Sequence, residues 1–260
     1  MASSAYLNGL ATRQKVLGLR LVGLVRMKRG LLRAVSRPNG LALGRRPSDS
    51  AWWAWGALCA ELKEDVRTAL SKLTAGRYKT VYADPPWDWM QGGKNAAPRV
   101  SAVTGKSNRS SIGNTPYVRL STKELLLLGP AIQRAAAPNS HLYLWTVNKT
   151  IPDAVRIIEA WGYRWVSMIT WDKGRPGIAK YFQGVTEHCI FAVRGSLPYK
   201  FVDGKMQQGH MLIAERMTDH SRKPAAMREV IERVSYGPYL ELFGRRVPRN
   251  WDAIGLELEL

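Results

Sequence analysis

The sequence predicts an α/β fold with a largely parallel sheet, and three observations support this prediction. From residue 54 onward, short runs typical of β-strands alternate with stretches whose apolar residues recur at helical spacing. Turn-forming residues separate these runs. The chain has 260 residues, 45% of them hydrophobic, which suffices for one domain of about 200 residues plus an appendage. Strands and helices that alternate in this way are typical of parallel sheets.

The beginning of the chain differs from the rest in charge. Residues 1–48 contain ten Lys and Arg and no Asp or Glu, so about half of the net charge of +19 lies there. Leucines and basic residues interleave over residues 17–29, which makes this stretch amphipathic. We therefore divide the chain into a basic extension, 1–48, and a folded domain, 49–260. A nucleic-acid-binding arm, an Arg-rich targeting peptide and a solvated extension all fit the composition of the first part.

The first predicted elements of the domain lead to a proline-rich turn. Apolar residues over 54–73 recur near every 3.6 positions, which predicts a helix that ends before Gly76. Lys79–Ala83 is a β-type run, and it ends at the tetrapeptide Asp-Pro-Pro-Trp. Residues 88–116 are rich in Gly, Asn, Ser and Lys and predict a long loop.

The middle of the chain predicts two helices around one strand. The segment Ser121–Glu124 has the sequence of a capping box, which predicts a helix over Leu125–Ala137. Leu142–Thr146 is a strand-like run. A second helix is expected over Ile151–Trp161, ended by Gly162.

The last third of the domain predicts three strands and a helix. Tyr163–Trp171 and His188–Val193 have the composition of strands. Pro224 suits the first turn of a helix and predicts one that runs to about Val234. Tyr239–Phe243 is the final predicted strand.

Composition indicates a polyanionic partner. A net charge of +19 favours nucleic acid, because Lys and Arg release counterions when they neutralise phosphates. A membrane surface is the competing partner, but no apolar run reaches the roughly 18 residues of a membrane span.

The two cysteines, Cys59 and Cys189, form no motif and are expected to be buried thiols in a reducing compartment, which favours the cytoplasm. The four histidines share no ligand spacing, so we expect no metal site.

The sequence Asp84-Pro85-Pro86-Trp87 is the candidate catalytic loop. It follows a predicted buried strand, and ligands of open α/β sheets bind beyond the carboxyl ends of strands. The prolines lack backbone donors, so the loop offers carbonyl acceptors, a carboxylate at Asp84 and an aromatic face at Trp87. Such a site suits an amino group on a flat ring, such as the exocyclic amine of adenine. A strand-ending turn with a core tryptophan is the structural alternative.

The chain resembles the family of mRNA adenine-N6 methyltransferases named for their seventy-kilodalton subunit, together with its bacterial and phage relatives. The likeness extends from about Tyr78 to Gly255 and rests on an ordered set of blocks. These blocks are Asp84–Trp87, Pro116–Ser121, Leu142–Trp145, Trp161–Tyr163, Thr186–Cys189, Val193–Gly195, His220–Pro224, Glu241–Arg245 and Asn250–Gly255.

The resemblance implies a Rossmann-like methyltransferase sheet with helices on both faces, in which the catalytic motif precedes the cofactor motif. The implied cofactor is S-adenosylmethionine. Its pocket is expected to be formed by residues that follow the last predicted strand or precede the last helix. These are Lys223, Phe243, Gly244, Arg245, Asn250 and Glu257. Tyr117, in the block similar to the family's substrate loop, is expected to shape the adenine pocket.

The long loop is expected to close over a nucleic acid substrate. Lys94 and Arg99 in this loop would contact phosphates. We expect adenine-N6 methylation, with DNA preferred over RNA because the compact chain looks like a bacterial or phage relative. A homodimer or a paralogous partner subunit is compatible with the resemblance. A catalytically silent nucleic-acid-binding subunit is the main alternative, favoured by Leu256 where the family usually carries Asn. A methyltransferase for small molecules or proteins is a second one.

Other prominent residues are expected to be structural. His188 and His220 are predicted to be hydrogen-bonded histidines and not catalysts. Four tryptophans in the middle of the domain are predicted to lie in the core, namely Trp145, Trp161, Trp165 and Trp171.

Overall fold

The computed structural model describes residues 60, 63–88, 119–176, 181–196, 199–217, 222–244 and 246–255. The basic extension 1–48 and the long loop therefore lie outside the described residues. So do several residues to which a role was assigned, namely Cys59, Lys94, Arg99, Tyr117, His220, Arg245, Leu256 and Glu257.

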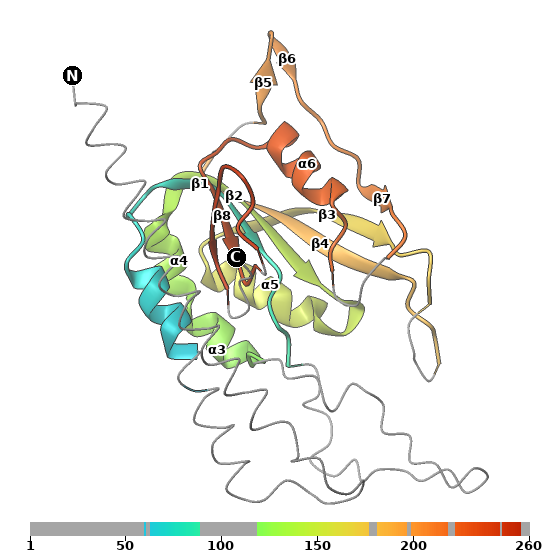
Figure 1. The fold of residues 1–260 in the computed structure, drawn as a ribbon, viewed down its shortest axis with the longest axis horizontal. Helices are drawn as coiled ribbons and strands as arrows, with labels where there is room; N and C mark the ends of the chain where they lie inside the picture. The colour runs from blue at the N-terminus through green and yellow to red at the C-terminus, as the bar shows by residue number, and fades with distance from the viewer. Residues whose placement is uncertain are drawn as a thin grey trace, which may run out of the picture.

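A seven-stranded sheet forms the centre of the described structure (Figure 1). Its strand order is β7-β3-β4-β2-β1-β8-β9. The strands are β1 Tyr78–Ala83, β2 Ala136–Thr146, β3 Arg164–Asp172, β4 Thr186–Arg194, β7 Leu212–Ala214, β8 Tyr239–Leu242 and β9 Trp251–Ile254. The strand β4 runs antiparallel to both β2 and β3, whereas the other neighbouring pairs are parallel. The prediction of a largely parallel sheet is thus confirmed.

Helices cover both faces of this sheet. They are a helix through residues 63–71, α3 Thr122–Leu127, α4 Gly129–Ala135, the 3-10 turn η2 Asn148–Thr150, α5 Ile151–Ala160 and α6 Ala226–Val234. Leu142 and Leu144 of β2 pack in one core cluster with α3, α4 and α5. Tyr143 and Trp145 point to the other face and pack in a second cluster with α6. This is the Rossmann-like arrangement that the resemblance implied.

A hairpin of β5 Phe201–Val202 and β6 Lys205–Met206 projects above α6, away from the sheet (Figure 1). In the described parts of the chain, no helix is long and apolar enough to span a membrane.

The capping box at Ser121 and Glu124 is confirmed, but the single helix predicted after it is wrong. The chain forms two helices, with a break at Leu128, and the strand β2 begins at Ala136. Pro130 lacks a backbone donor and occupies the first turn of α4, so it starts a new helix. A Cβ atom at Gly129 would meet the Ala160 carbonyl oxygen at 2.5 Å, so glycine allows α4 to approach α5 closely.

Two further predictions need correction. The helix α6 begins at Ala226, two residues after Pro224, which lies in the turn before it. Trp145, Trp161 and Trp171 are buried as predicted, but Trp165 is 37% exposed. The register of β3 shifts between Trp165 and Ser167, and β7 pairs with β3 only over Thr170–Asp172. Among the described residues, Trp165 thus lies in the part of β3 that has no pairing with β7.

Candidate active site

The Asp-Pro-Pro-Trp loop begins at the carboxyl edge of the sheet. Ala83 pairs with Leu144 of β2 on one side and Leu242 of β8 on the other, and Leu242 pairs with Ile254 of β9. The four strands are parallel, so their carboxyl ends lie together. Asp84 directly follows β1, and its backbone N–H donates to the Leu242 carbonyl at 3.4 Å. Asp84 thus lies where ligands of open α/β sheets bind.

Hydrogen bonds fix the conformation of this loop. The Trp87 N–H donates to the Pro85 carbonyl at 2.8 Å, and the Leu120 N–H donates to the Pro86 carbonyl at 2.9 Å. The indole N–H of Trp87 donates to the Trp145 carbonyl at 3.0 Å. The ring of Trp87 is half-buried, so its edge is held by β2 while part of its surface faces solvent. The loop is rigidly tied to the segment that precedes α3.

A cluster of charged side chains surrounds Asp84. The Lys223 ammonium lies 3.0 Å from an Asp84 carboxylate oxygen and 3.2 Å from a Glu187 carboxylate oxygen. It also lies 5.3 Å from the centre of the Trp145 ring. A second ammonium, that of Lys173, lies 3.3 Å from Glu187. These contacts bring together the ends of β1, β3 and β4 and the segment before α6.

The cluster favours the charged forms of Glu187 and Lys223. Burial alone would raise the pKa of the Glu187 carboxyl, but Lys223 and Lys173 outweigh burial and hold the pKa below its usual value. Burial likewise opposes the charge of Lys223, and its two carboxylate partners raise the pKa of the ammonium above its usual value. Near neutral pH, Lys223 is therefore a fixed cation.

The anionic neighbours of Lys223 were only partly expected. The resemblance assigned Lys223 to the cofactor pocket, and the structure shows that two carboxylates of the chain itself face it. Glu187 stood in the block Thr186–Cys189 without an assigned role. Glu187 directly precedes the predicted strand His188–Val193, and no local signal in the sequence places it beside Asp84.

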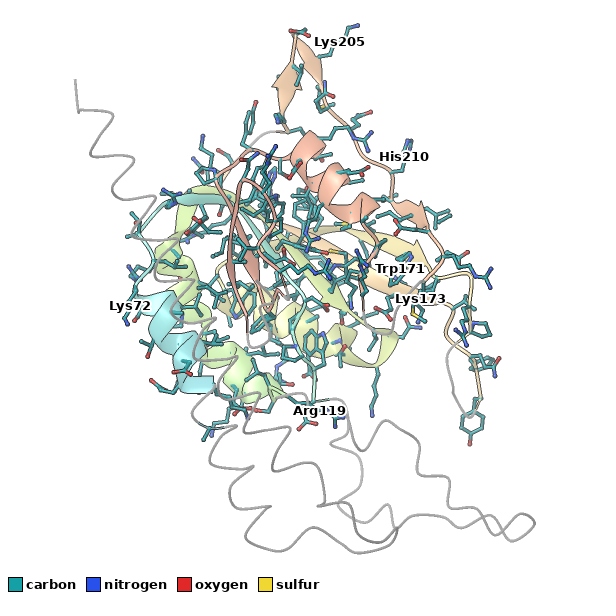
Figure 2. All side chains as sticks on the ribbon, viewed as in Figure 1. Lys72, Arg119, Trp171, Lys173, Lys205 and His210 are labelled. Atoms are coloured by element: carbon teal, nitrogen blue, oxygen red, sulfur yellow. The ribbon has the colours of Figure 1, made fainter. Side chains whose placement is uncertain are left out.

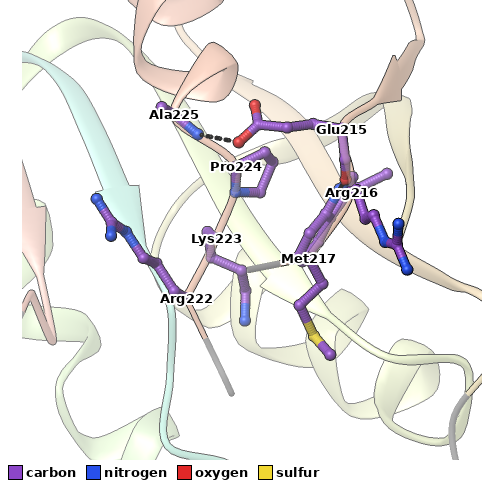
Figure 3. Close-up of a pocket in the computed structure, with 8 residues that line it drawn as sticks. Glu215, Arg216, Met217, Arg222, Lys223, Pro224 and Ala225 are labelled. Carbon is purple, nitrogen blue, oxygen red and sulfur yellow. Dashed lines mark hydrogen bonds between the residues drawn. The ribbon is translucent and has the colours of Figure 1, made fainter. Parts of the chain in front are cut away.

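Hydrogen bonds to Glu215, the residue after β7, hold the segment that carries Lys223. The Glu215 carboxylate accepts the N–H groups of Ala225 and Ala226 at 3.1 and 3.2 Å, at the start of α6 (Figure 3). The Glu215 carbonyl accepts the indole N–H of Trp171 at 2.7 Å. A partly open cavity of about 240 Å³ lies beside these residues. Its lining is Trp171, Glu215, Arg216, Met217, Arg222, Lys223, Pro224 and Ala225. The cavity opens beside the Lys223 side chain.

Of the residues after β8, Phe243 and Gly244 lie at the carboxyl edge of the sheet and Asn250 lies at the amino edge. Phe243 has a φ of 64°, and its N–H donates to the Ile254 carbonyl at 2.6 Å, so Phe243 and the buried Gly244 turn the chain at the carboxyl edge. A side chain on Gly255 would collide with the Gly244 carbonyl, so β8 and β9 approach closely here. Asn250 precedes β9 and is exposed at the amino edge. Its position therefore disagrees with the assigned cofactor contact.

The buried Glu241 lies one residue before the end of β8 and has its own partner. The Arg228 guanidinium holds both its carboxylate oxygens, at 2.8 and 2.9 Å. Burial raises the pKa of Glu241, and Arg228 opposes this shift. This pair links α6 to the sheet beside the site.

His188 and Cys189 have structural surroundings. The two ring nitrogens of His188 contact Thr170 Oγ1 at 3.1 Å and Asn148 Oδ1 at 2.7 Å, and burial lowers the pKa of the ring. The prediction of a hydrogen-bonded histidine is confirmed. Cys189 is buried as predicted, and burial raises the pKa of its thiol well above its usual value. Within the described residues, no three His, Cys, Asp or Glu side chains group as metal ligands.

The MT-A70 family profile matches residues 78–257. This span includes the catalytic loop, the charge cluster and the end of β8. The chain belongs to the MT-A70 family. The members are S-adenosylmethionine-dependent methyltransferases, so this is the expected cofactor.

Three relatives of this chain are named as methyltransferases. The chain is 27% identical to the type II methyltransferase M.MunI of a Mycoplasma species, over 72% of this chain and 80% of that enzyme. It is 29% identical to the human N(6)-adenosine-methyltransferase catalytic subunit METTL3, over 71% of this chain and 29% of that subunit. The Drosophila melanogaster MT-A70-like N(6)-adenosine-methyltransferase is 27% identical over 73% of this chain and 28% of its own length. The chain thus spans less than a third of these eukaryotic relatives. An adenine-N6 methyltransferase is the enzyme type that these relatives support.

The lowered pKa of Glu187 makes one contribution to stability dependent on pH. A carboxyl with a lowered pKa in the folded state stabilises the protein above its usual pKa, about 4.5, and loses this effect as pH falls through the folded value. We expect Glu187→Gln to lower the free energy of unfolding by about 1–3 kcal/mol at pH 7. The difference from the original protein should shrink below pH 4.5.

Urea unfolding at several pH values between 3 and 7 measures this effect. Glu64→Gln is a suitable control, because Glu64 is 66% exposed and its ion pair in the described part of the chain is with Arg67 on its own helix. A Glu187→Gln deficit that stays constant down to pH 3 would contradict the assignment.

Proposed function

We propose that this protein methylates the N6 amine of adenine in DNA, with the carboxylate of Asp84 and the carbonyl of Pro85 as the groups that hold the amine. The observation that carries the proposal is the placement of Asp84 at the carboxyl edge of four parallel strands, where Lys223 fixes its carboxylate.

The residues at this edge fit S-adenosylmethionine. The cofactor has a carboxylate, an ammonium group and a sulfonium, and it supplies an electrophilic methyl group when bound. Lys223 offers a cation for the carboxylate, and Glu187 and Asp84 offer anions for positively charged groups. At the end of β8, next to this cluster, Phe243 has a positive φ and Gly244 adds no side chain, so the chain can turn there. These residues would hold the cofactor.

The catalytic loop would act by orientation. The amine of adenine is a weak nucleophile, because its lone pair is delocalised into the ring. The Asp84 carboxylate and the Pro85 carbonyl can each accept one of its N–H bonds. A carbonyl oxygen accepts two hydrogen bonds, so the bond from Trp87 still leaves capacity at Pro85. Holding the amine in line with a methyl group can supply about 7–11 kcal/mol of the barrier. Trp87 offers a half-buried ring for stacking on the base.

Two observations support DNA as the polymer. The net charge of +19 suits a polyanion. The chain is also similar to the type II methyltransferase M.MunI over 80% of that enzyme's length. A duplex substrate would require its adenine to leave the stack, at a cost of a few kcal/mol.

A competition assay tests the choice of polymer. DNA and RNA of the same mixed sequence, in single-stranded and duplex form, would compete for a limiting amount of enzyme with labelled S-adenosylmethionine. We expect label mainly in DNA, with activity that falls steeply as salt rises. Label mainly in RNA would contradict the proposed polymer, and label on free adenosine without salt dependence would contradict a nucleic acid substrate.

A further inference from the structure

Two adjacent aromatic side chains between β3 and β4 are almost fully exposed to solvent. Tyr181 is 92% exposed and Phe182 is 90% exposed, more than any other large hydrophobic side chain in the described parts of the protein. Single exposed apolar residues are common on protein surfaces. Two adjacent rings that are almost fully exposed are unusual, because their burial elsewhere would be favourable. We call this pair the aromatic tip.

The aromatic tip belongs to the connection between β3 and β4. Both β2 and β3 are antiparallel to β4, so β3 ends at the same edge of the sheet as β1 and β2. The connection after Asp172 therefore leaves from the carboxyl edge, and Figure 1 shows its described parts extending beyond the sheet. The tip and the Asp-Pro-Pro-Trp loop project from one edge.

The base of this connection is tied to the charge cluster. The Lys173 N–H donates to the Val185 carbonyl at 2.9 Å, which closes the base. The Lys173 side chain pairs with Glu187, which in turn pairs with Lys223. Figure 2 shows Lys173 next to Trp171 at the end of β3. The connection that carries the tip therefore begins at the charge cluster that contains Asp84.

The charges around this connection are suited to a polyanion. Arg216 lies close to Gly174, where an added Cβ would come 4.0 Å from its Cγ. Arg216 also lines the 240 Å³ cavity, together with Arg222 and Lys223. The nearby carboxylate of Glu187 is already paired with two lysines. A ligand with flat, apolar groups on an anionic backbone matches exposed aromatic rings on a connection whose base lies near Arg216. Nucleic acid bases on their phosphate backbone have this chemistry.

We propose that Tyr181 and Phe182 stack on bases next to the target adenine and occupy the space that this adenine leaves when it turns toward Asp84. This inference rests on the proposed function, because it takes the polymer and the target base from it. Apolar wedges of this kind stabilise unstacked steps of DNA, and stacking on aromatic rings tolerates any sequence.

The test compares binding of the full chain to a fluorescent DNA duplex that contains 2-aminopurine beside an adenine. The variants are Tyr181→Ala, Phe182→Ala, the double variant, and Tyr181→Phe as an aromatic replacement. We expect the double variant to bind about 10- to 100-fold more weakly and to lose the 2-aminopurine signal, because stacking is lost. Tyr181→Phe should behave like the original protein. A duplex with abasic sites beside the adenine should bind the original protein and the double variant equally.

Phe201→Ala is the matched control. Phe201 is also an exposed aromatic residue, at 51%, but it lies on the β5–β6 hairpin with Lys205, far from the carboxyl edge in Figure 2. The affinity of the Phe201→Ala variant for DNA should differ from that of the original protein by less than about twofold.

Two results would overturn the inference. One is unchanged affinity and 2-aminopurine signal in the double variant. The other is a double variant that binds DNA normally but changes its mass in light scattering, which would make the tip a contact between protein subunits. Binding is measured without cofactor, so the outcome is separate from methyl transfer. If the original protein methylates DNA but the double variant binds DNA as well as the original does, the inference about the tip is refuted and the proposed function stands. If binding depends on the tip but the original protein methylates no DNA, the proposed function is refuted and the role of the tip in binding stands.

Discussion

Replacement of Asp84 by alanine is expected to lower the rate of methyl transfer by a factor on the order of 10³ or more. The substitution removes the carboxylate that would hold the amine of adenine, and it removes one partner of Lys223 at 3.0 Å. The backbone of the loop should survive, because its hydrogen bonds run through Pro85, Pro86 and Trp87. Single-turnover transfer of labelled methyl measures the effect on the chemical step directly.

Asp88→Ala is the matched control for this variant. Asp88 is the next carboxylate along the same loop, and its N–H donates to the Leu120 carbonyl at 3.1 Å, a backbone bond that alanine retains. Its activity should stay within a few fold of the original. Thermal unfolding of both variants separates a loss of chemistry from a loss of folding. A folded Asp84→Ala protein that retains a tenth or more of the activity would contradict a catalytic role for Asp84.

Replacement of Lys223 by methionine is expected to have the second largest effect. The Asp84 and Glu187 carboxylates would then face each other across a site where the Lys223 side chain is only 16% exposed. Removal of one partner from a buried ion pair typically costs about 3–5 kcal/mol. Asp84 keeps 30% exposure, so we expect a value near the lower limit, about 3 kcal/mol. Urea unfolding at pH 7 measures it.

The same variant tests the proposed cofactor contact. Calorimetry should show at least tenfold weaker binding of S-adenosylmethionine to Lys223→Met, because a charge-assisted bond to the carboxylate is lost. The double variant Lys223→Met, Glu187→Gln should recover part of the stability, since it removes the repulsion between carboxylates, and should not recover cofactor binding. Lys123→Met, on the exposed surface of α3, should change neither quantity. Normal cofactor affinity in folded Lys223→Met would remove Lys223 from the cofactor site.

The sequence determined the position of the catalytic loop well, because local signals were sufficient. A buried β-type run followed by two prolines can only end a strand, and β1 ends one residue before Asp84 as predicted. The break between α3 and α4 also had a local signal in Gly129 and Pro130, which the prediction did not use. The exposure of Trp165 had none, because a register shift in β3 and a short neighbouring strand depend on tertiary packing.

The charge cluster could not be predicted from the sequence. Asp84, Glu187 and Lys223 lie far apart along the chain and meet only because β4 runs antiparallel between β2 and β3. The antiparallel direction places the first residues of β4, including Glu187, at the edge where β1 ends. A strand-like run of residues carries no information on its direction, so this contact follows from the topology alone. The same topology shows that Asn250 lies at the opposite edge.

The most direct test of the central claim is the chemical identity of the product. The purified chain would be incubated with S-adenosylmethionine and DNA of mixed sequence, and the DNA would then be digested to nucleosides and analysed by mass spectrometry. The account predicts N6-methyladenine from the original protein, at a level that Asp84→Ala does not reach. A folded, DNA-binding protein that produces no methylated adenine, or that methylates another base, would contradict it.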